Sequence, residues 1–237
     1  MRRRPRPRLR TVVLSAVLLL LAGSFGVWAL FFSHWLRVDH VSVHGQDVLT
    51  AERIRETADI PLGTPLAAVD EDAVRDRLLK RLRRLDDADV VRAWPHGIGL
   101  KVTERQPVLL MRKSGRFVEV DKEGVRFATV RKAPAHVPLL RLKADGSPTL
   151  RYFGRDRLRR EAVDVAAALP PEVARDTRVV EVRSYDAITL RLTGDRTVVW
   201  GSGEQSQAKA KALDALLKAA KDADHFDVSV PTSPAAS

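Results

Sequence analysis

A run of 22 residues without an ionisable side chain, Thr11 to Phe32, most constrains how this 237-residue chain can fold. Six arginines and no acidic residue lie in the ten residues before it. At about 1.5 Å of rise per residue, a helix over the run reaches roughly 33 Å, which matches the hydrocarbon core of a bilayer. Trp28 and Trp35 lie near its far end, and tryptophan favours the membrane interface. We therefore predict a transmembrane helix over residues 11–32.

The arginine-rich head fixes the expected orientation of this helix. The cytoplasmic flanks of membrane helices carry an excess of lysine and arginine. Residues 1–10 are therefore expected to form a short basic cytoplasmic head, and everything after about Leu36 to lie on the other side of the membrane. The sequence predicts a single-pass protein of the cytoplasmic membrane with extracytoplasmic C-terminal domains.

Two other interpretations of the N-terminus are open. A cleavable secretory signal also has a basic head and an apolar run, and Ala22-Gly23-Ser24 offers a cleavage site with small residues. The apolar run continues past that site to Phe32, beyond the usual hydrophobic region of roughly 7 to 15 residues. Arginine clusters also bind nucleic acid, but here the cluster adjoins a membrane-length segment, which favours the anchor.

Composition limits the chemistry of the exported part. The net charge is +11, but outside the head 35 basic residues face 30 acidic ones, so this part is only mildly basic. No cysteine is present, which excludes disulfides, thiolate metal sites and a lipoprotein anchor. About 200 residues suffice for two modest domains with cores of their own.

The first part of the exported region predicts a small α+β domain. Alternating valines at Val41 to Val43 indicate a strand, Thr50 can cap a first helix, and Asp70 a second whose apolar face reaches Leu85. Two alternating apolar segments around Pro95-His96-Gly97 indicate a hairpin. The order strand, helix, helix, strand, strand predicts one sheet with two helices on one face.

A β-rich region with helices follows a junction at Glu104 to Pro107. Its predicted elements are a hairpin over 117–120 and 125–127, a helix over 158–169 ended by Pro170 and Pro171, strands at 179–182, 188–192 and 197–200, a helix over 207–221, and a terminal strand over 226–230. Prolines at 231 and 234 prevent extension of that strand, so residues 231–237 are expected to be a flexible tail.

Residues with catalytic or metal-binding chemistry do not form a recognised motif. The six histidines have no metal-ligand spacing, and His40 and His44 are expected on a solvated strand face. Gly201-Ser202-Gly203 fits an anion cradle or, more commonly, the entry to a helix. Motifs of serine, penicillin-binding and zinc hydrolases do not occur. We predict no catalytic residue, no metal, no cofactor and no small-molecule substrate.

The terminal strand is the candidate interaction site. If it lies at a sheet edge, its unpaired backbone groups can receive a strand from a partner protein. The candidate partner-binding residues are Phe226, Asp227, Val228, Ser229 and Val230. The alternative is that the strand is buried within the sheet, and both placements stay open.

Five segments, in this order and spacing, give the chain a resemblance to the FtsQ (DivIB) family of bacterial cell-division proteins. They are Val38-Asp39-His40-Val41-Ser42-Val43-His44-Gly45, Gly63-Thr64-Pro65-Leu66, Val102-Thr103-Glu104-Arg105-Gln106-Pro107, the hairpin Phe117 to Gly124, and Asp227-Val228-Ser229-Val230-Pro231. The chain differs from better-known members in ending with a proline-broken tail instead of a longer strand.

The resemblance implies a POTRA domain (β-α-α-β-β) at 36–104 and an FtsQ-type β domain at 105–230. It implies a non-enzymatic scaffold at the division septum that binds other membrane-anchored division proteins, FtsB and FtsL-like, and no nucleic acid. Such a scaffold links early and late divisome components and helps control septal peptidoglycan synthesis. In the family, strand addition by FtsB would involve Phe226 to Val230.

Two other functions fit the sequence less well than this scaffold. A POTRA-containing export or envelope assembly factor would need a barrel-forming region, and the residues after the first domain lack the lipid-facing alternation of about ten residues that such strands show. An anchored envelope hydrolase would need catalytic residues, for which the sequence offers no motif.

Overall fold

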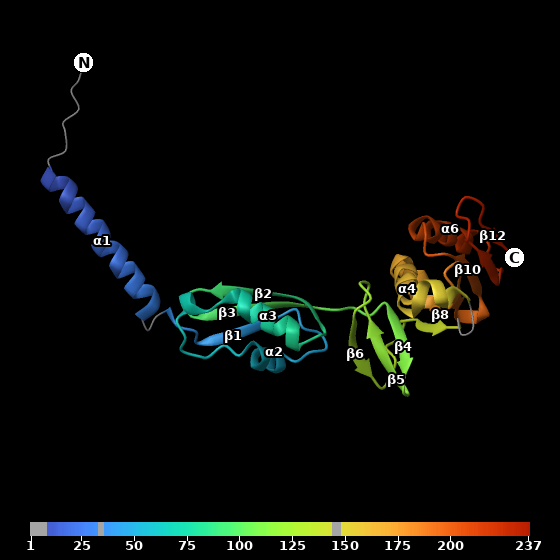
Figure 1. The fold of residues 1–237 in the computed structure, drawn as a ribbon, viewed down its shortest axis with the longest axis horizontal. Coiled ribbons are helices and arrows are strands. Elements are labelled where there is room, and N and C mark those ends of the chain that lie inside the picture. The colour runs from blue at the N-terminus through green and yellow to red at the C-terminus, as the bar shows by residue number, and fades with distance from the viewer. Residues whose placement is uncertain (1–8, 33–35, 144–147) are drawn as a thin grey trace, which may run out of the picture. The chain divides into compact units, whose positions relative to one another are not determined.

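The computed structural model describes residues 9–32, 36–143 and 148–237 (Figure 1). The chain forms two compact units, one ending at Glu104 and the other beginning at Arg105. Each unit has a hydrophobic core of its own. The predicted α+β class is confirmed, with a small mixed domain followed by a β-rich domain that also carries helices.

The first helix, α1, runs from Leu9 to Phe32 and covers the uncharged run. Trp28 is exposed near its end. Within the described ranges, the structure contains no helix with both the length and the apolar character needed to cross a membrane. The predicted transmembrane helix therefore stays a prediction. Residues 1–8 of the basic head, as well as Trp35, lie outside the described residues.

The first unit contains one three-stranded sheet in the order β1-β3-β2. Strand β1 is parallel to β3, with Val41 opposite Ile98, and β2 is antiparallel to β3, with Val90 opposite Leu100. Its remaining elements are β1 (His40–His44), α2 (Ala51–Ala58), the 3₁₀ helix η2 (Leu66–Ala68), α3 (Glu71–Arg81), β2 (Leu85–Ala93) and β3 (Gly97–Glu104).

Helix caps and a shared core hold this unit together. The Thr50 hydroxyl accepts a hydrogen bond from Arg53 N at 3.2 Å and starts α2, and Asp70 Oδ1 accepts one from Ala73 N at 2.9 Å and starts α3. Both caps confirm the predicted helix starts. The helices and β3 then contribute fully buried side chains to one core, among them Ile54, Leu78, Ile98 and Leu100.

The second predicted helix is too long by one turn. Helix α3 ends at Arg81, Leu82 is its C-cap, and Leu85 begins β2. The backbone N–H of Leu85 donates to the Leu82 carbonyl at 2.9 Å, which forms a turn into the strand. The side chain of Leu85 is buried all the same, so its apolar spacing reflects the core and not the helix.

The second unit contains one nine-stranded sheet in the order β12-β11-β10-β9-β8-β7-β4-β5-β6. Its elements are β4 (Leu109–Lys113), β5 (Arg116–Val120), β6 (Arg126–Val130), β7 (Leu139–Leu142), α4 (Pro148–Ala168), α5 (Pro171–Asp176), β8 (Thr177–Ser184), β9 (Ala187–Leu192), the 3₁₀ turn η3 (Thr193–Asp195), β10 (Thr197–Gly201), α6 (Ser206–Ala219), β11 (His225–Asp227) and β12 (Ala235–Ala236). In Figure 1, β4, β5 and β6 lie together at one side of this unit, and α6, β10 and β12 at another.

Most strands predicted from the sequence are present in this unit. Strands β8, β9 and β10 form the predicted antiparallel meander, and β5 and β6 form the predicted hairpin. Strands β4 and β7 were not predicted, and they join the two groups through parallel pairing of β4 with β7 and of β7 with β8. Leu158 of α4 and Leu213 of α6 pack with Leu190 and Trp200 of the sheet in the core.

Two predicted chain ends differ in the structure. Pro171 does not simply end a helix, because it is the first residue of α5, where its missing N–H would have no helical partner. Residues 231–237 do not form a loose tail, because β12 pairs with β11. Pro231 and Pro234 lie between these strands, where the Ser233 N–H donates to the Val230 carbonyl and turns the chain back.

Candidate functional site

Strand β11 carries the first residues of the predicted interaction site, and it is an inner strand. It is parallel to β10 on one side and antiparallel to β12 on the other. The side chains of Phe226 and Val228 are 1% and 0% exposed and belong to the core. Of the two placements that the sequence left open, β11 thus has the inner one, and the outer edge of the sheet lies at β12.

A turn over Asp227 to Ser229 ends β11 after three residues. Asp227 Oδ1 accepts hydrogen bonds from the Ser229 backbone N–H at 2.9 Å and from its hydroxyl at 2.6 Å. Such local bonds compete with strand pairing and favour a turn. The turn lies against Gly201, whose φ is +78° and where a Cβ atom would come within 3.1 Å of Ser229 Cβ. The absence of a side chain at Gly201 therefore allows the backbone at Ser229 to lie close to it.

Strand β12 forms the outer edge of the sheet on this side. His225 and Ser237 exchange two backbone hydrogen bonds, of 3.0 and 2.9 Å. Because hydrogen-bonded and non-hydrogen-bonded pairs alternate in antiparallel strands, the backbone N–H and C=O of Ala236 point away from β11. Two residues earlier, Pro234 offers only a carbonyl. The edge thus presents the Ala236 donor and acceptor to an added strand.

The exposed part of the predicted set lies in the loop that joins β11 to β12. Val230 is 54% exposed. Its neighbour Ser229 is half-buried against Gly201. The structure therefore separates the five predicted residues into a buried pair, Phe226 and Val228, a polar turn and one exposed apolar side chain.

The loop Gly201-Ser202-Gly203 does not offer a free anion cradle. A Cβ atom at Gly203 would lie 2.2 Å from Glu161 Oε2, so a carboxylate already occupies the space beside the loop. Burial raises the pKa of Glu161. The buried Lys209 donates from Nζ to the Ser202 carbonyl at 2.9 Å, and burial lowers its pKa. The loop serves as the entry to α6.

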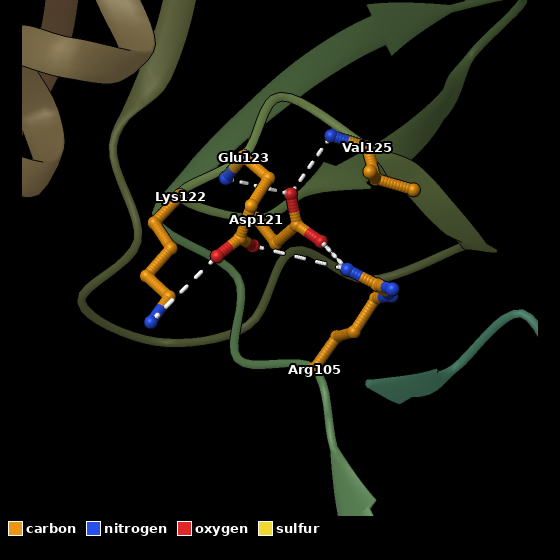
Figure 2. A network of polar contacts seen from close by, with 5 residues as sticks. All are labelled: Arg105, Asp121, Lys122, Glu123 and Val125. Carbon is orange, nitrogen blue, oxygen red and sulfur yellow. Dashed lines mark hydrogen bonds and ion pairs between the residues drawn. The ribbon is translucent and has the colours of Figure 1, made fainter. Parts of the chain in front are cut away.

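A polar network fixes the turn between β5 and β6 (Figure 2). Asp121 is almost completely buried, and its Oδ1 accepts hydrogen bonds from the backbone N–H groups of Glu123 at 3.0 Å and Val125 at 2.8 Å. Its Oδ2 accepts from the guanidinium of Arg105. Glu123 in turn lies 3.8 Å from Arg105 and 3.6 Å from Lys122. Arg105 is thereby attached to the second unit.

The preceding residue, Glu104, is attached to the first unit. Its Oε1 accepts three backbone hydrogen bonds, from Asp47 at 2.8 Å, Val48 at 3.0 Å and Leu49 at 2.8 Å. A carboxylate that receives several N–H groups holds a loop strongly, because each bond is charge-assisted. The two neighbouring charged residues therefore stabilise different units: Glu104 the first and Arg105 the second. This is why charged side chains occur at the predicted junction.

Two family models match the chain in succession. One is described as the POTRA domain, FtsQ-type, and covers residues 36–105. The other is described as the C-terminal part of cell division protein FtsQ/DivIB and covers residues 109–229, half of the chain. The chain belongs to the FtsQ/DivIB family. The gap between the models, residues 106–108, directly follows the Glu104-Arg105 pair.

Curated FtsQ proteins resemble the chain over most of its length. Cell division protein FtsQ of Streptomyces coelicolor is 59% identical over 235 residues, which cover 98% of this chain and 89% of that protein. FtsQ of Streptomyces griseus is 62% identical over 86% of this chain and 99% of that protein. FtsQ of Mycolicibacterium smegmatis is 34% identical over 95% of this chain and 64% of that protein.

Among solved structures, the extracytoplasmic domain of DivIB from Geobacillus stearothermophilus matches with a TM-score of 0.36 and 17% identity. It covers 50% of this chain and 96% of that domain.

The suspected family is thus confirmed, and it is a cell-division family, not a known enzyme family. Residues 109–229 match the FtsQ/DivIB model, which does not favour the alternative of an export or assembly factor. Within the described parts of the chain, no group of three or more metal-ligating side chains is gathered. Sequence reasoning missed Ala236, because a two-residue strand beside two prolines carries no alternation signal.

Proposed function

We propose that this FtsQ-family protein is a membrane-anchored scaffold of the divisome that binds FtsB- and FtsL-like division proteins. Binding would link early and late divisome components and so help control septal peptidoglycan synthesis. The observation that carries the proposal is the outward backbone donor and acceptor of Ala236, at the edge of a domain that matches the FtsQ/DivIB model. Such an edge favours addition of a partner strand.

The site for the partner strand is the outer side of β12 together with the loop that precedes it. Ala236 supplies the backbone pairing, and the exposed Val230, in the loop before β12, supplies an apolar contact. The other four predicted residues have an indirect role. They form β11 and the turn after it, and β12 pairs with β11; these residues are Phe226, Asp227, Val228 and Ser229. The proposal thus keeps the predicted segment and assigns the direct contact to its exposed end.

Anchoring in the cytoplasmic membrane is the second part of the proposal, and the sequence supports it. The 22 uncharged residues from Thr11 to Phe32 follow six arginines, a pattern typical of a span with a cytoplasmic N-terminus. Tethering two partners to one membrane raises their effective concentration, so a weak edge contact suffices for binding. We infer residence at the division septum with the C-terminal domains outside the cytoplasm.

Substitution of Ala236 tests the edge. Ala236→Pro removes the outward N–H, whereas Ala236→Val keeps it and adds only a side chain. We expect co-purification of the FtsB-like partner to fall about tenfold for the proline variant and to stay near wild type for the valine variant. Unchanged far-UV circular dichroism shows that both variants are folded. Equal partner recovery from both variants would contradict strand addition at β12.

Orientation and location are tested in cells. Protease added to spheroplasts should digest the large C-terminal part, and a fluorescent fusion should form a band at mid-cell. Resistance to the protease would overturn the anchoring. A uniform peripheral signal through the cell cycle would overturn the division role.

A further inference from the structure

A cavity of about 220 Å³ lies between α4 and the strands β4 to β7. Its floor is apolar and formed by core residues, among them Leu109, Val120 and Val163. The cavity is far along the sheet order from β12, because β6 and β12 are the two ends of the nine-stranded sheet. It therefore belongs to a surface that the proposed function does not use.

Arginines dominate the rim of this cavity. Arg126 begins β6, and Arg159 and Arg160 come from α4. The two acidic residues of the rim are engaged: Asp156 pairs with Arg159, and Glu123 lies near Arg105 and Lys122. Among the described residues, no carboxylate forms an ion pair with Arg126 or Arg160. The charge of Arg160 acts on its neighbour Glu161, but Arg126 and Arg160 lie outside any ion pair of the described residues.

The electrostatics of Arg159 support this assessment. Burial lowers the pKa of its guanidinium, and the charges of Arg126 and Arg155 lower it further. An arginine stays protonated in a protein, so these guanidinium groups repel one another, and Asp156 offsets the charge of Arg159 only. An incoming carboxylate relieves this repulsion and can pair with two guanidinium groups in a planar geometry.

The strand beside the cavity is an open sheet edge. Among the strands of the described residues, β6 pairs with β5 only, so one side of Arg126–Val130 lacks a neighbour there. An extended peptide added there would place alternate side chains on the cavity face, next to Arg126. An acidic side chain at one of these alternate positions can then reach the cationic rim at Arg126.

We propose that the β6 edge and the arginine-rimmed cavity bind an extended acidic segment of a protein partner. The segment pairs with β6 through its backbone, and one of its carboxylates lies between Arg126 and Arg160. This surface gives the C-terminal unit a second binding edge, independent of β12.

The test uses the full chain in detergent and two rhodamine-labelled peptides, Gly-Val-Glu-Val-Glu-Val-Gly and its counterpart with glutamine for glutamate. We expect fluorescence anisotropy to show binding of the glutamate peptide and at least about tenfold weaker binding of the glutamine peptide. Hydrogen exchange should show added protection of residues 126–130 when the glutamate peptide is bound, because their outward N–H groups become paired.

Variants locate the binding. The double variant Arg126→Gln/Arg160→Gln neutralises the rim and should weaken binding of the glutamate peptide at least about tenfold. Arg178→Gln, at an exposed arginine of β8, should change the affinity for this peptide less than about twofold. Ala236→Pro should leave it unchanged, which separates this site from the β12 edge.

Three results would overturn the proposal. They are equal binding of the two peptides, no binding up to about 1 mM peptide, and binding without protection of β6. Rim-dependent binding of phosphatidylglycerol vesicles without peptide binding would instead assign the cavity to an anionic lipid surface.

Discussion

The buried carboxylate of Glu181 gathers four cationic side chains around one position of the sheet. It is 1% exposed in the middle of β8, and four cations surround it. Lys143 lies 3.1 Å from it and Arg183 2.9 Å, while Arg141 and Arg191 lie at 3.8 and 3.7 Å. A buried charge is costly unless it is paired, so these cations decide whether the glutamate can remain ionised.

The pH dependence of stability should report this balance. Burial acts to raise the pKa of Glu181, but the contacts with Lys143 and Arg183 outweigh it, so the pKa lies below the ordinary glutamate value. Its stabilisation is therefore complete above the unfolded pKa and is lost as the pH falls through the folded pKa. We expect Glu181→Gln to lower the free energy of unfolding by about 1–3 kcal/mol at neutral pH.

Urea unfolding of Glu181→Gln and wild type checks this at two pH values. The difference between them should shrink as the pH falls through the lowered pKa of Glu181, where the wild-type carboxyl also becomes protonated. Asp222→Asn, at an exposed acid in the loop after α6, serves as the control and should change little at either pH. A difference that stays constant with pH would mean that packing, not charge, stabilises this position.

The short strand β11 contributes to the fold through its side chains more than through its length. Phe226→Ala removes a fully buried ring from the core, so we expect a loss of about 3–5 kcal/mol in the free energy of unfolding. Val230→Ala, in the exposed loop, should change the free energy of unfolding by less than about 0.5 kcal/mol. Thermal unfolding followed by circular dichroism measures both. Equal losses would contradict the assignment of Phe226 to the core.

Local signals in the sequence predicted the elements that depend on local chemistry. The caps at Thr50 and Asp70 and the glycine turn after Asp121 involve groups only a few residues apart, and the structure confirms each of them. Strand β4 pairs with β5 across the two-residue turn Ser114-Gly115, a local hairpin signal that sequence reasoning missed. Strand β7 depends on parallel pairing between distant segments, which leaves no local trace. The same limit applies to the candidate site, because alternation along 226–230 is the same for an inner and an outer strand.

At the scale of the whole chain, the two units fold around separate cores. Of two adjacent residues, Glu104 stabilises the first unit and Arg105 the second. We therefore expect Glu104→Gln to destabilise the first unit and Asp121→Asn, which weakens the bond with Arg105, to destabilise the second. Each change should cost about 1–3 kcal/mol, because a charged acceptor of several N–H groups is lost.

Hydrogen exchange under increasing denaturant can follow the two units separately. Residues 97–104 report on the first core and residues 187–192 on the second. Each substitution should shift the exchange of its own reporter only. Lys122→Ala, beside Asp121 but exposed, is the control for the second unit. A shift of both reporters by either substitution would mean that the units unfold together.

The shortness of β12 also limits aggregation of the protein through its sheet edge. A long, regular outer strand is a template on which identical copies stack into aggregates. Here the rim of the sheet offers the Ala236 N–H, and the position two residues before it is a proline that has none. A matching segment from a different protein can still complete the pairing, whereas growth of a fibre from copy to copy lacks the repeated donors it needs.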